Sequence, residues 1–410
     1  MRSDGELMLG GLLRNSHTAS FEDIVPLLNE HAPMAGFSNP MVYVSDLQQK
    51  YLVPLPNQFS AGGEPLTRLN IDTTIAGRAF RNVELVHARP DEDLPPCEQE
   101  DGLRLWSPLL DGTERVGVVG GITQRVDEVI EWRFKRLSTL LSLLVVSKRQ
   151  TSDTYSRMVR EKPMTLSAEV LHNLLPNGSF ANDEVVIAAA LEPAYQVGGD
   201  VFEYGIEDDQ LHVSIFDAMG HDLASGLTAS IAVGSCRSNR LKGAGLVAIS
   251  EAIDEAIAQH FQLSRFATGI IANLDMSTGT LSWVNRGHHP ALVVRNGKLA
   301  ATLGSAKPAP PMGFRLGRRA EVEHYQLHAG DRLLFYTDGI VEARSPEGEP
   351  FGLERFIDYI VRREADGLPA PETLRRLIQS IMRYQRGRLQ DDATVLTVEW
   401  MSGRRPGVTL

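Results

Sequence analysis

The chain has 410 residues and a formal net charge of −11, with 42% hydrophobic and 23% charged residues. This composition is typical of a folded, water-soluble protein, and the length predicts two domains joined by a linker. The acidic balance, without a run of five basic residues, argues against a nucleic-acid-binding surface.

Several classes of protein are excluded by what the sequence lacks. No apolar stretch approaches the length of a membrane-spanning helix, and the first residues lack the basic start and cleavage site of a signal peptide. The two cysteines, Cys97 and Cys236, have no spacing that indicates a zinc site or a disulfide framework. We therefore expect a cytoplasmic protein with free thiols.

The first 126 residues predict a tail and a small sensor domain. Residues 1–19 are mostly polar or small, which predicts a disordered tail. Residues 20–126 predict an α+β domain with helices over 21–32 and 73–80. Its strands are expected at 41–44, 51–53, 83–87, 103–108 and 115–121. The segments IAGRAF (75–80) and WSPLLDGTERVGVVGG (106–121) resemble a GAF domain. GAF domains bind diverse small molecules or none, so the resemblance identifies no ligand.

Residues 127–176 predict a helical linker. Five apolar residues in it recur at spacings of four, three, four and three: Ile130, Phe134, Leu137, Leu141 and Leu144. This pattern is typical of a coiled-coil seam and predicts a homodimer, although it also suits a helix packed on its own sensor domain. Pro163 interrupts helical continuity before a second helix over 167–176.

Residues 177–400 predict a second α+β domain, followed by a short tail over 401–410. Turn signals favour antiparallel strand pairing, with the helices outside the sheets. Strands are expected at 185–191, 211–216, 267–274, 280–284, 291–295, 333–336 and 395–400, and helices at 223–239, 246–261, 353–361 and 372–384.

Four aspartates stand beside apolar runs in this second domain: Asp200, Asp217, Asp338 and Asp391. We expect each at the end of a buried strand, where an isolated carboxylate must be paired, protonated or bound to a cation. Glycines next to the first two would let backbone carbonyls approach a metal. No Cys or His cluster accompanies the four, which favours Mg²⁺ or Mn²⁺ over Zn²⁺.

Six short motifs now identify a family resemblance. They are LLP (174–176), VGGD (197–200), DAMGH (217–221), NRGHHP (285–290), TDG (337–339) and DDAT (391–394). In this order, over residues 165–400, the chain resembles the SpoIIE/RsbU-like branch of the metal-dependent (PPM, type 2C) protein phosphatases. The resemblance implies an α-β-β-α sandwich and a protein serine/threonine phosphatase.

The resemblance also implies a site and its partners. Asp200, Asp217, Asp338, Asp391 and the backbone carbonyl of Ala218 would hold two Mn²⁺ or Mg²⁺ ions. The implied substrate is a phosphorylated STAS-type anti-sigma-factor antagonist, with the N-terminal domain as regulator. A catalytically inert scaffold that binds the same partners is the alternative.

Some residues near these motifs need a separate interpretation. Glu203, Asp222 and Arg286 depart from the family pattern, and we expect Asp222 to cap the following helix rather than bind metal. Asp392 is expected to support Asp391 or cap the turn, and Glu342 to contact the ligands rather than the ions. Local hydrogen-bonding roles are expected for His221, His288 and His289.

Overall fold

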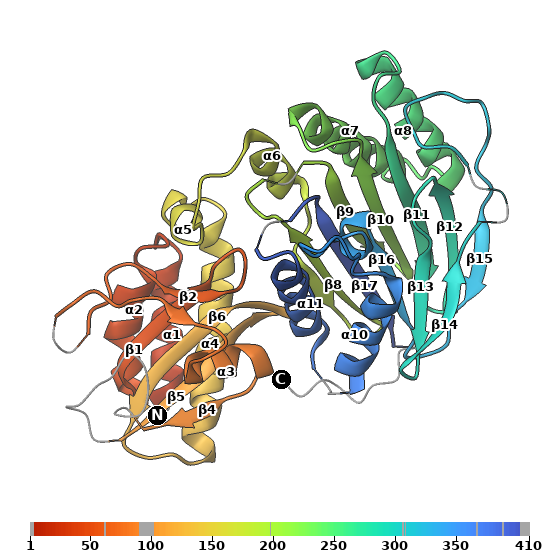
Figure 1. The fold of residues 1–410 in the computed structure, drawn as a ribbon. Coiled ribbons are helices and arrows are strands. Elements are labelled where there is room, and N and C mark those ends of the chain that lie inside the picture. Colours follow the sequence, from red (N-terminus) through yellow and green to blue (C-terminus); the bar gives the residue numbers. More distant parts are fainter. Residues whose placement is uncertain are drawn as a thin grey trace. The chain divides into compact units, whose positions relative to one another are not determined.

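The computed structural model describes residues 4–60, 63–89, 102–196, 198–305, 307, 309–365, 368–387 and 389–401. Contacts divide the chain into an N-terminal unit, residues 1–162, and a C-terminal unit, residues 163–410 (Figure 1). Cys97 and the predicted tail from residue 402 onward lie outside the described residues.

The N-terminal unit is built on a six-stranded antiparallel sheet in the order β3-β2-β1-β6-β5-β4. Helices α1, α2 and α4 pack on one face of it and α3 on the other. In β1, Val42 and Val44 face the first group while Met41 and Tyr43 face α3, because alternate side chains of a strand point to opposite faces. The elements are α1 (Asp4–Ser16), α2 (Ile24–His31), η1 (Ala32–Ala35), β1 (Ser38–Ser45), β2 (Tyr51–Pro54), β3 (Leu69–Asn70), α3 (Ile75–Asn82), β4 (Val86–Ala88), β5 (Leu103–Asp111), β6 (Glu114–Thr123), α4 (Glu128–Arg149) and α5 (Asp153–Met158).

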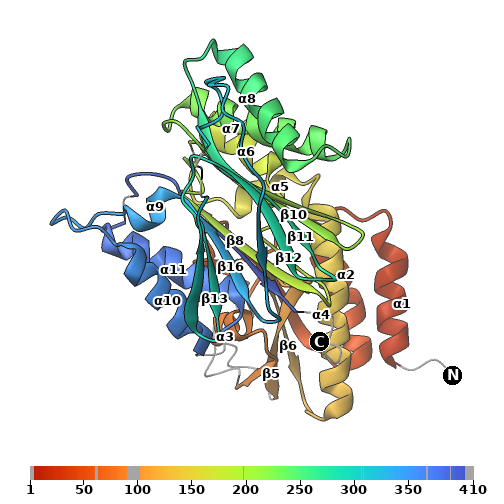
Figure 2. The same cartoon turned by 90° about the vertical axis from the view of Figure 1, so that its right-hand side faces the viewer.

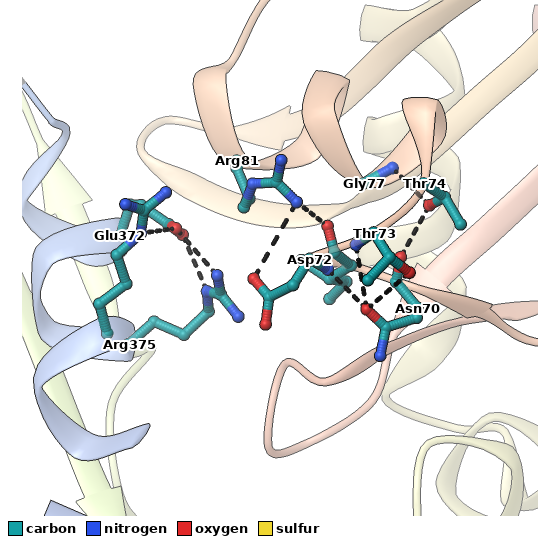
Figure 3. Close-up of polar contacts among 10 residues, drawn as sticks. Asn70, Asp72, Thr73, Thr74, Gly77, Arg81, Glu372 and Arg375 are labelled. Atoms are coloured by element: carbon teal, nitrogen blue, oxygen red, sulfur yellow. Dashed lines mark hydrogen bonds and ion pairs between the residues drawn. The ribbon is translucent and has the colours of Figure 1, made fainter. Parts of the chain in front are cut away.

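Helix α3 confirms the helix predicted over 73–80, and its start is fixed by side-chain caps (Figure 3). The hydroxyl of Thr74 accepts a hydrogen bond from the backbone N–H of Gly77 at 3.1 Å. Asn70 Oδ1 accepts from the N–H groups of Asp72 and Thr73. A Cβ on Gly77 would lie 2.0 Å from the carbonyl oxygen of Ile71, so only glycine allows this close approach.

Two predictions for this half of the chain are wrong. Residues 4–16 are not a disordered tail but helix α1, in which Met8 and Leu12 are completely buried. Helix α4 is not part of a separate linker either: all five residues of its seam belong to the core of the N-terminal unit, as in the alternative of a helix packed on its own domain. A stripe that already packs on its own sheet cannot also form the predicted dimer seam.

The C-terminal unit contains two antiparallel sheets. One has the order β15-β12-β11-β10-β9 and the other β14-β13-β16-β17-β8-β7. The strands are β7 (Ser179–Ala181), β8 (Val185–Glu192), β9 (Asp200–Glu207), β10 (Gln210–Ala218), β11 (Ala267–Asp275), β12 (Thr280–Arg286), β13 (Ala291–Arg295), β14 (Lys298–Leu303), β15 (Glu323–Gln326), β16 (Arg332–Tyr336) and β17 (Ala393–Trp400). The facing sides of the two sheets share one apolar core.

Helices cover the outer face of each sheet (Figure 2). Helices α6 (Leu166–Leu174), α7 (Leu223–Arg240) and α8 (Leu246–Phe261) pack on the five-stranded sheet. Helices α9 (Asp338–Val341), α10 (Leu353–Ala365) and α11 (Ala370–Tyr384) pack on the six-stranded sheet. The predicted α-β-β-α sandwich is therefore confirmed.

Glu372, in the first turn of α11, forms ion pairs with two arginines of the same helix. Glu372 accepts a hydrogen bond from Arg375 at 2.8 Å (Figure 3). It also accepts one from Arg376 at 2.7 Å. These i,i+3 and i,i+4 pairs support the first turn of the helix, where a carboxylate is also favoured by the helix dipole.

Among the described residues, no helix is both long and apolar enough to cross a lipid bilayer.

Candidate metal centre

Strands β9 and β10 bring the first two predicted aspartates together. Asp200 and Asp217 are direct partners in the antiparallel register of the two strands. Asp200 begins β9, which corrects the prediction that it ends a strand. It lies opposite Asp217, near the end of β10, because neighbouring antiparallel strands run in opposite directions. Asp200 is only 2% exposed, and Asp217 is half-buried.

Thr337 ties Asp200 to the second sheet. Its hydroxyl donates to Asp200 Oδ2 at 2.6 Å and accepts from the backbone N–H of Thr394 at 3.0 Å. Asp338 follows directly as the first residue of α9. Asp391 is exposed and lies two residues before β17, which corrects its predicted place at the end of a buried strand. Asp200 and Asp217 thus belong to strands of the five-stranded sheet, whereas Asp338 and Asp391 adjoin strands of the six-stranded sheet.

The carboxylates of this region influence one another electrostatically. Burial, together with the charges of Asp338, Asp391 and Asp392, raises the pKa of Asp217 to about 7. Burial and the charges of Asp217 and Asp392 raise the pKa of Asp200 well above its usual value. Mutual repulsion of this kind is relieved when a cation binds between the carboxylates.

Two glycines allow the backbone to close around this point. A Cβ on Gly199 would lie 2.4 Å from the carbonyl oxygen of Ala218, and a Cβ on Gly198 would lie 2.4 Å from Cα of His221. Any side chain there would push apart the segment before Asp200 and the segment after Asp217. The Ala218 carbonyl oxygen therefore lies against the backbone of the residue before Asp200.

Asp392 anchors the same segment in a way the sequence does not reveal. Its Oδ2 accepts hydrogen bonds from the backbone N–H groups of Gly198, Gly199 and Asp200, at 2.7, 2.7 and 3.2 Å. Its own N–H donates to Asp391 Oδ1 at 2.9 Å. Asp392 thus supports Asp391 as predicted, and it also fixes the loop that presents Asp200.

The three departures from the family pattern have local structural roles. Asp222 caps α7 by accepting from the N–H of Ser225 at 2.9 Å, and it pairs with Arg265 at 2.7 Å. The predicted cap is confirmed, and the Arg265 contact, with those of Ser225, lowers the pKa of Asp222. Buried Arg286 donates to the carbonyl oxygen of Pro310 and lies 3.4 Å from Asp254. Buried Glu203 pairs with Arg237 and Arg240.

The neighbouring histidines differ in role. His288 is buried, with Nδ1 2.8 Å from the hydroxyl of Thr268 and Nε2 3.1 Å from the carbonyl oxygen of Tyr336. The predicted hydrogen-bonding role is confirmed for this residue. His289 instead stacks on the Tyr336 ring, with centroids 5.8 Å apart. His221 is exposed.

An all-oxygen set drawn from Asp200, Asp217, Ala218, Asp338 and Asp391 fits hard divalent cations such as Mg²⁺ and Mn²⁺. The raised pKa values and the glycine-lined approach of Ala218 both fit a site that holds positive charge.

Comparison with known proteins agrees with this geometry. Residues 207–401 match the family model for Stage II sporulation protein E (SpoIIE). This segment, which makes up most of the C-terminal unit, is similar to the SpoIIE family. The matched segment contains Asp217, Asp338 and Asp391 and begins after Asp200. The predicted family resemblance is confirmed, whereas the GAF resemblance of the N-terminal unit stays a prediction.

Two curated relatives and one solved structure illustrate the similarity. Protein IcfG of Synechocystis sp. is 26% identical over 279 residues, which cover 61% of this chain and 43% of IcfG. Phosphoserine phosphatase RsbU of Bacillus subtilis is 23% identical, over 57% of this chain and 68% of RsbU. The structure of the RsbU and RsbW domains of Rv1364c from Mycobacterium tuberculosis is 25% identical with a TM-score of 0.47, over 55% of this chain and 64% of that chain. The chain thus spans less than half the length of IcfG.

Proposed function

We propose that the C-terminal unit is a metal-dependent phosphatase that hydrolyses phosphoserine or phosphothreonine in a protein substrate. The observation that carries the proposal is the pairing of Asp200 with Asp217 across two strands, at a point where the charges of Asp338 and Asp391 act on Asp217. The SpoIIE match supports it, as does the similarity to a relative named phosphoserine phosphatase.

Asp200, Asp217, Asp338, Asp391 and the carbonyl of Ala218 would hold two Mn²⁺ or Mg²⁺ ions. The chemistry that such a pair supplies is activation of water at neutral pH and neutralisation of phosphate charge. The chain's own part is positioning: Asp392 holds the backbone of residues 198–200, and Thr337 holds the carboxylate of Asp200. No side chain needs to act as a nucleophile.

The proposed substrate is a phosphorylated STAS-type anti-sigma-factor antagonist. This part of the proposal rests on the motif resemblance and on the similarity to RsbU. The proposed regulator is the N-terminal unit acting as a GAF-like sensor, which rests on the resemblance of IAGRAF and the segment 106–121 to GAF domains. The buried seam of α4 gives no support to a homodimer through that stripe.

The decisive experiment measures phosphate release from a phosphoserine STAS-type protein with Mn²⁺, with Mg²⁺ and with EDTA. We expect release only with a divalent ion, and a loss of at least about 100-fold in Asp338→Asn and Asp391→Asn. Asp209→Asn, which changes an exposed aspartate in the β9–β10 turn, is the matched control. Equal turnover in metal-free buffer would contradict the proposal, and substrate binding without release would identify an inert scaffold.

A further inference from the structure

The N-terminal unit contains a hollow of about 430 Å³ on the face of its sheet opposite α3. Val53 in β2, which lines the hollow, is paired with Val44, whose side chain packs with α1, α2 and α4. Tyr51 shares this face, because alternate residues of a strand point to the same side. The hollow is thus separate from the apolar cluster that α3 covers, which contains Trp106. Its polar and charged lining comes from the β1–β2 turn, β2, the segment before β3 and the chain after α5: Asp46, Tyr51, Arg68, Arg160, Glu161 and Lys162.

Two contacts hold these distant segments together. The backbone N–H of Leu47 donates to the carbonyl oxygen of Val159 at 3.1 Å, which joins the β1–β2 turn to the end of α5. The Arg68 guanidinium lies 4.1 Å from the centroid of the Tyr51 ring, and its Nη1 lies 2.6 Å from Oε1 of Glu161. The walls of the hollow are therefore positioned without a ligand.

Asp46 brings a buried carboxylate to the hollow, and one of its oxygens is unsatisfied. Its Oδ1 accepts from the backbone N–H groups of Lys50 and Tyr51, at 2.7 and 2.8 Å. Asp46 is only 3% exposed, and among the described residues its Oδ2 has no hydrogen-bond partner. Burial, with a smaller contribution from the charge of Glu161, raises the pKa of Asp46. A cationic donor in the hollow would satisfy Oδ2 and offset both effects.

The chain after α5 supplies the opposite charge. Arg160 is half-buried and Lys162 is exposed, and both line the hollow. Guanidinium and ammonium groups bind carboxylates through charge-assisted hydrogen bonds. Glu161, which lies between them in sequence, is paired with Arg68. The hollow therefore presents a carboxylate from one segment and two cationic side chains from another.

We propose that this hollow binds a small zwitterion of the α-amino-acid class, with its ammonium group on Asp46 and its carboxylate on Arg160 and Lys162. A ligand with only positive charge would be repelled by the two cationic side chains, and one with only negative charge by Asp46. The volume lies within the range of about 300–1,000 Å³ that is usual for small-molecule sites.

The position of the hollow gives such a ligand a means of regulation. Arg160 and Lys162 belong to the last three residues of the N-terminal unit, and Pro163 begins the C-terminal unit. A bound amino acid would therefore fix the chain that leads into the C-terminal unit. The existence of the site depends neither on metal binding nor on phosphatase activity.

The test is calorimetric titration of the full chain, in EDTA, with each of the twenty standard amino acids. We expect at least one of them to bind with a Kd of about 1 mM or tighter. Asp46→Asn keeps the acceptor for the two backbone N–H groups but loses the charge, and we expect binding at least about tenfold weaker. Lys162→Gln, at an exposed position, should weaken binding in the same direction. Asp72→Asn and Lys135→Gln change exposed residues of the same unit and should bind as wild type.

Two analogues of the amino acid that binds separate the two ends of the ligand. The α-hydroxy acid replaces the ammonium group by a hydroxyl, and the amide removes the charge of the carboxylate. We expect each to bind at least about tenfold more weakly than the amino acid. The proposal is overturned by the absence of binding for all twenty amino acids, by unchanged binding in both Asp46→Asn and Lys162→Gln, or by equal binding of either analogue.

Discussion

At the scale of single residues, the carboxylate of Asp392 fixes the backbone of the site through several hydrogen bonds. It is 5% exposed and is the acceptor for three successive backbone N–H groups. Asp392→Ala leaves those donors without a partner, and we expect a loss of about 1–3 kcal/mol in the free energy of unfolding. Asp392→Asn keeps one acceptor oxygen, so we expect a clearly smaller loss in the free energy of unfolding than for Asp392→Ala. Urea unfolding in EDTA measures both, and equal losses would show that the acceptor oxygen is not what matters.

A chain of buried polar contacts between the five-stranded sheet and α7 predicts a pH dependence of stability. His212 Nδ1 lies 2.9 Å from Asn273 Oδ1, and its Nε2 lies 3.4 Å from Sγ of Cys236. Burial raises the pKa of Cys236 to about 12, so the thiol keeps its proton and donates it to Nε2. Burial also lowers the pKa of His212 from 6.5 to about 4. The folded protein therefore holds this ring neutral.

The sign of the effect follows from that shift. Above pH 6.5 the His212 ring is neutral in both the folded and the unfolded protein, so burial of the ring costs no stability there. Between pH 6.5 and 4 only the unfolded chain takes up the proton, so the free energy of unfolding falls by up to about 1.4 kcal/mol per pH unit, about 3 kcal/mol in all. We expect His212→Gln to have a flatter profile than wild type over this range in urea unfolding. Parallel profiles would contradict the interpretation.

The site residues that sequence reasoning found and missed differ in one physical respect. Asp200, Asp217, Asp338 and Asp391 stand out in the sequence because each is an acid beside an apolar run. Thr337 and Asp392 act through hydrogen bonds to residues 137 and 194 positions away. Spacing along the chain does not reveal such contacts, and a threonine directly after a strand is ordinary.

At the scale of elements, helix α4 is part of the N-terminal core and not a dimer seam, and this changes the effect expected of substitutions in it. Leu137 and Leu141 are completely buried in the core of the N-terminal unit. Glutamate at either position must bury a charge or expel the helix, so we expect Leu137→Glu and Leu141→Glu each to cost more than about 3 kcal/mol. Thr139→Glu, at an exposed position of the same helix, is the control. Circular dichroism should record a lost unfolding transition; folded monomers would restore the dimer interpretation.

The elements themselves were predictable where the apolar pattern was regular. A four-three spacing describes a helix with one apolar side, and it does not distinguish a partner helix from a sheet beneath. Strand β9 escaped prediction because it starts at the buried Asp200 and carries the buried Glu203, whose charge is paired with arginines on α7. Helix α1 escaped because its apolar patch from Leu7 to Leu13 is short and is interrupted by Gly10 and Gly11, which disfavour a helix.

At the scale of the whole molecule, each unit has its own hydrophobic core. The buried apolar clusters of the N-terminal unit are formed by residues within positions 8–159. Three other clusters, between and outside its two sheets, form the core of the C-terminal unit. Units with separate cores unfold as separate cooperative steps unless their interface is large and apolar. We therefore expect two transitions in calorimetry of the full chain in EDTA.

Metal should act on only one of these transitions. All the residues that we propose to hold ions lie in the C-terminal unit, so Mn²⁺ stabilises that unit by binding its folded state alone. At a free Mn²⁺ concentration about 100 times the Kd, the expected gain is about 2.7 kcal/mol, which raises the Tm of a unit of this size by roughly 5–10 °C. Asp217→Asn should lose most of this shift, while Leu141→Glu should remove the other transition and leave the shift intact. Equal displacement of both transitions by Mn²⁺ would show that the ions do not bind where the aspartates converge.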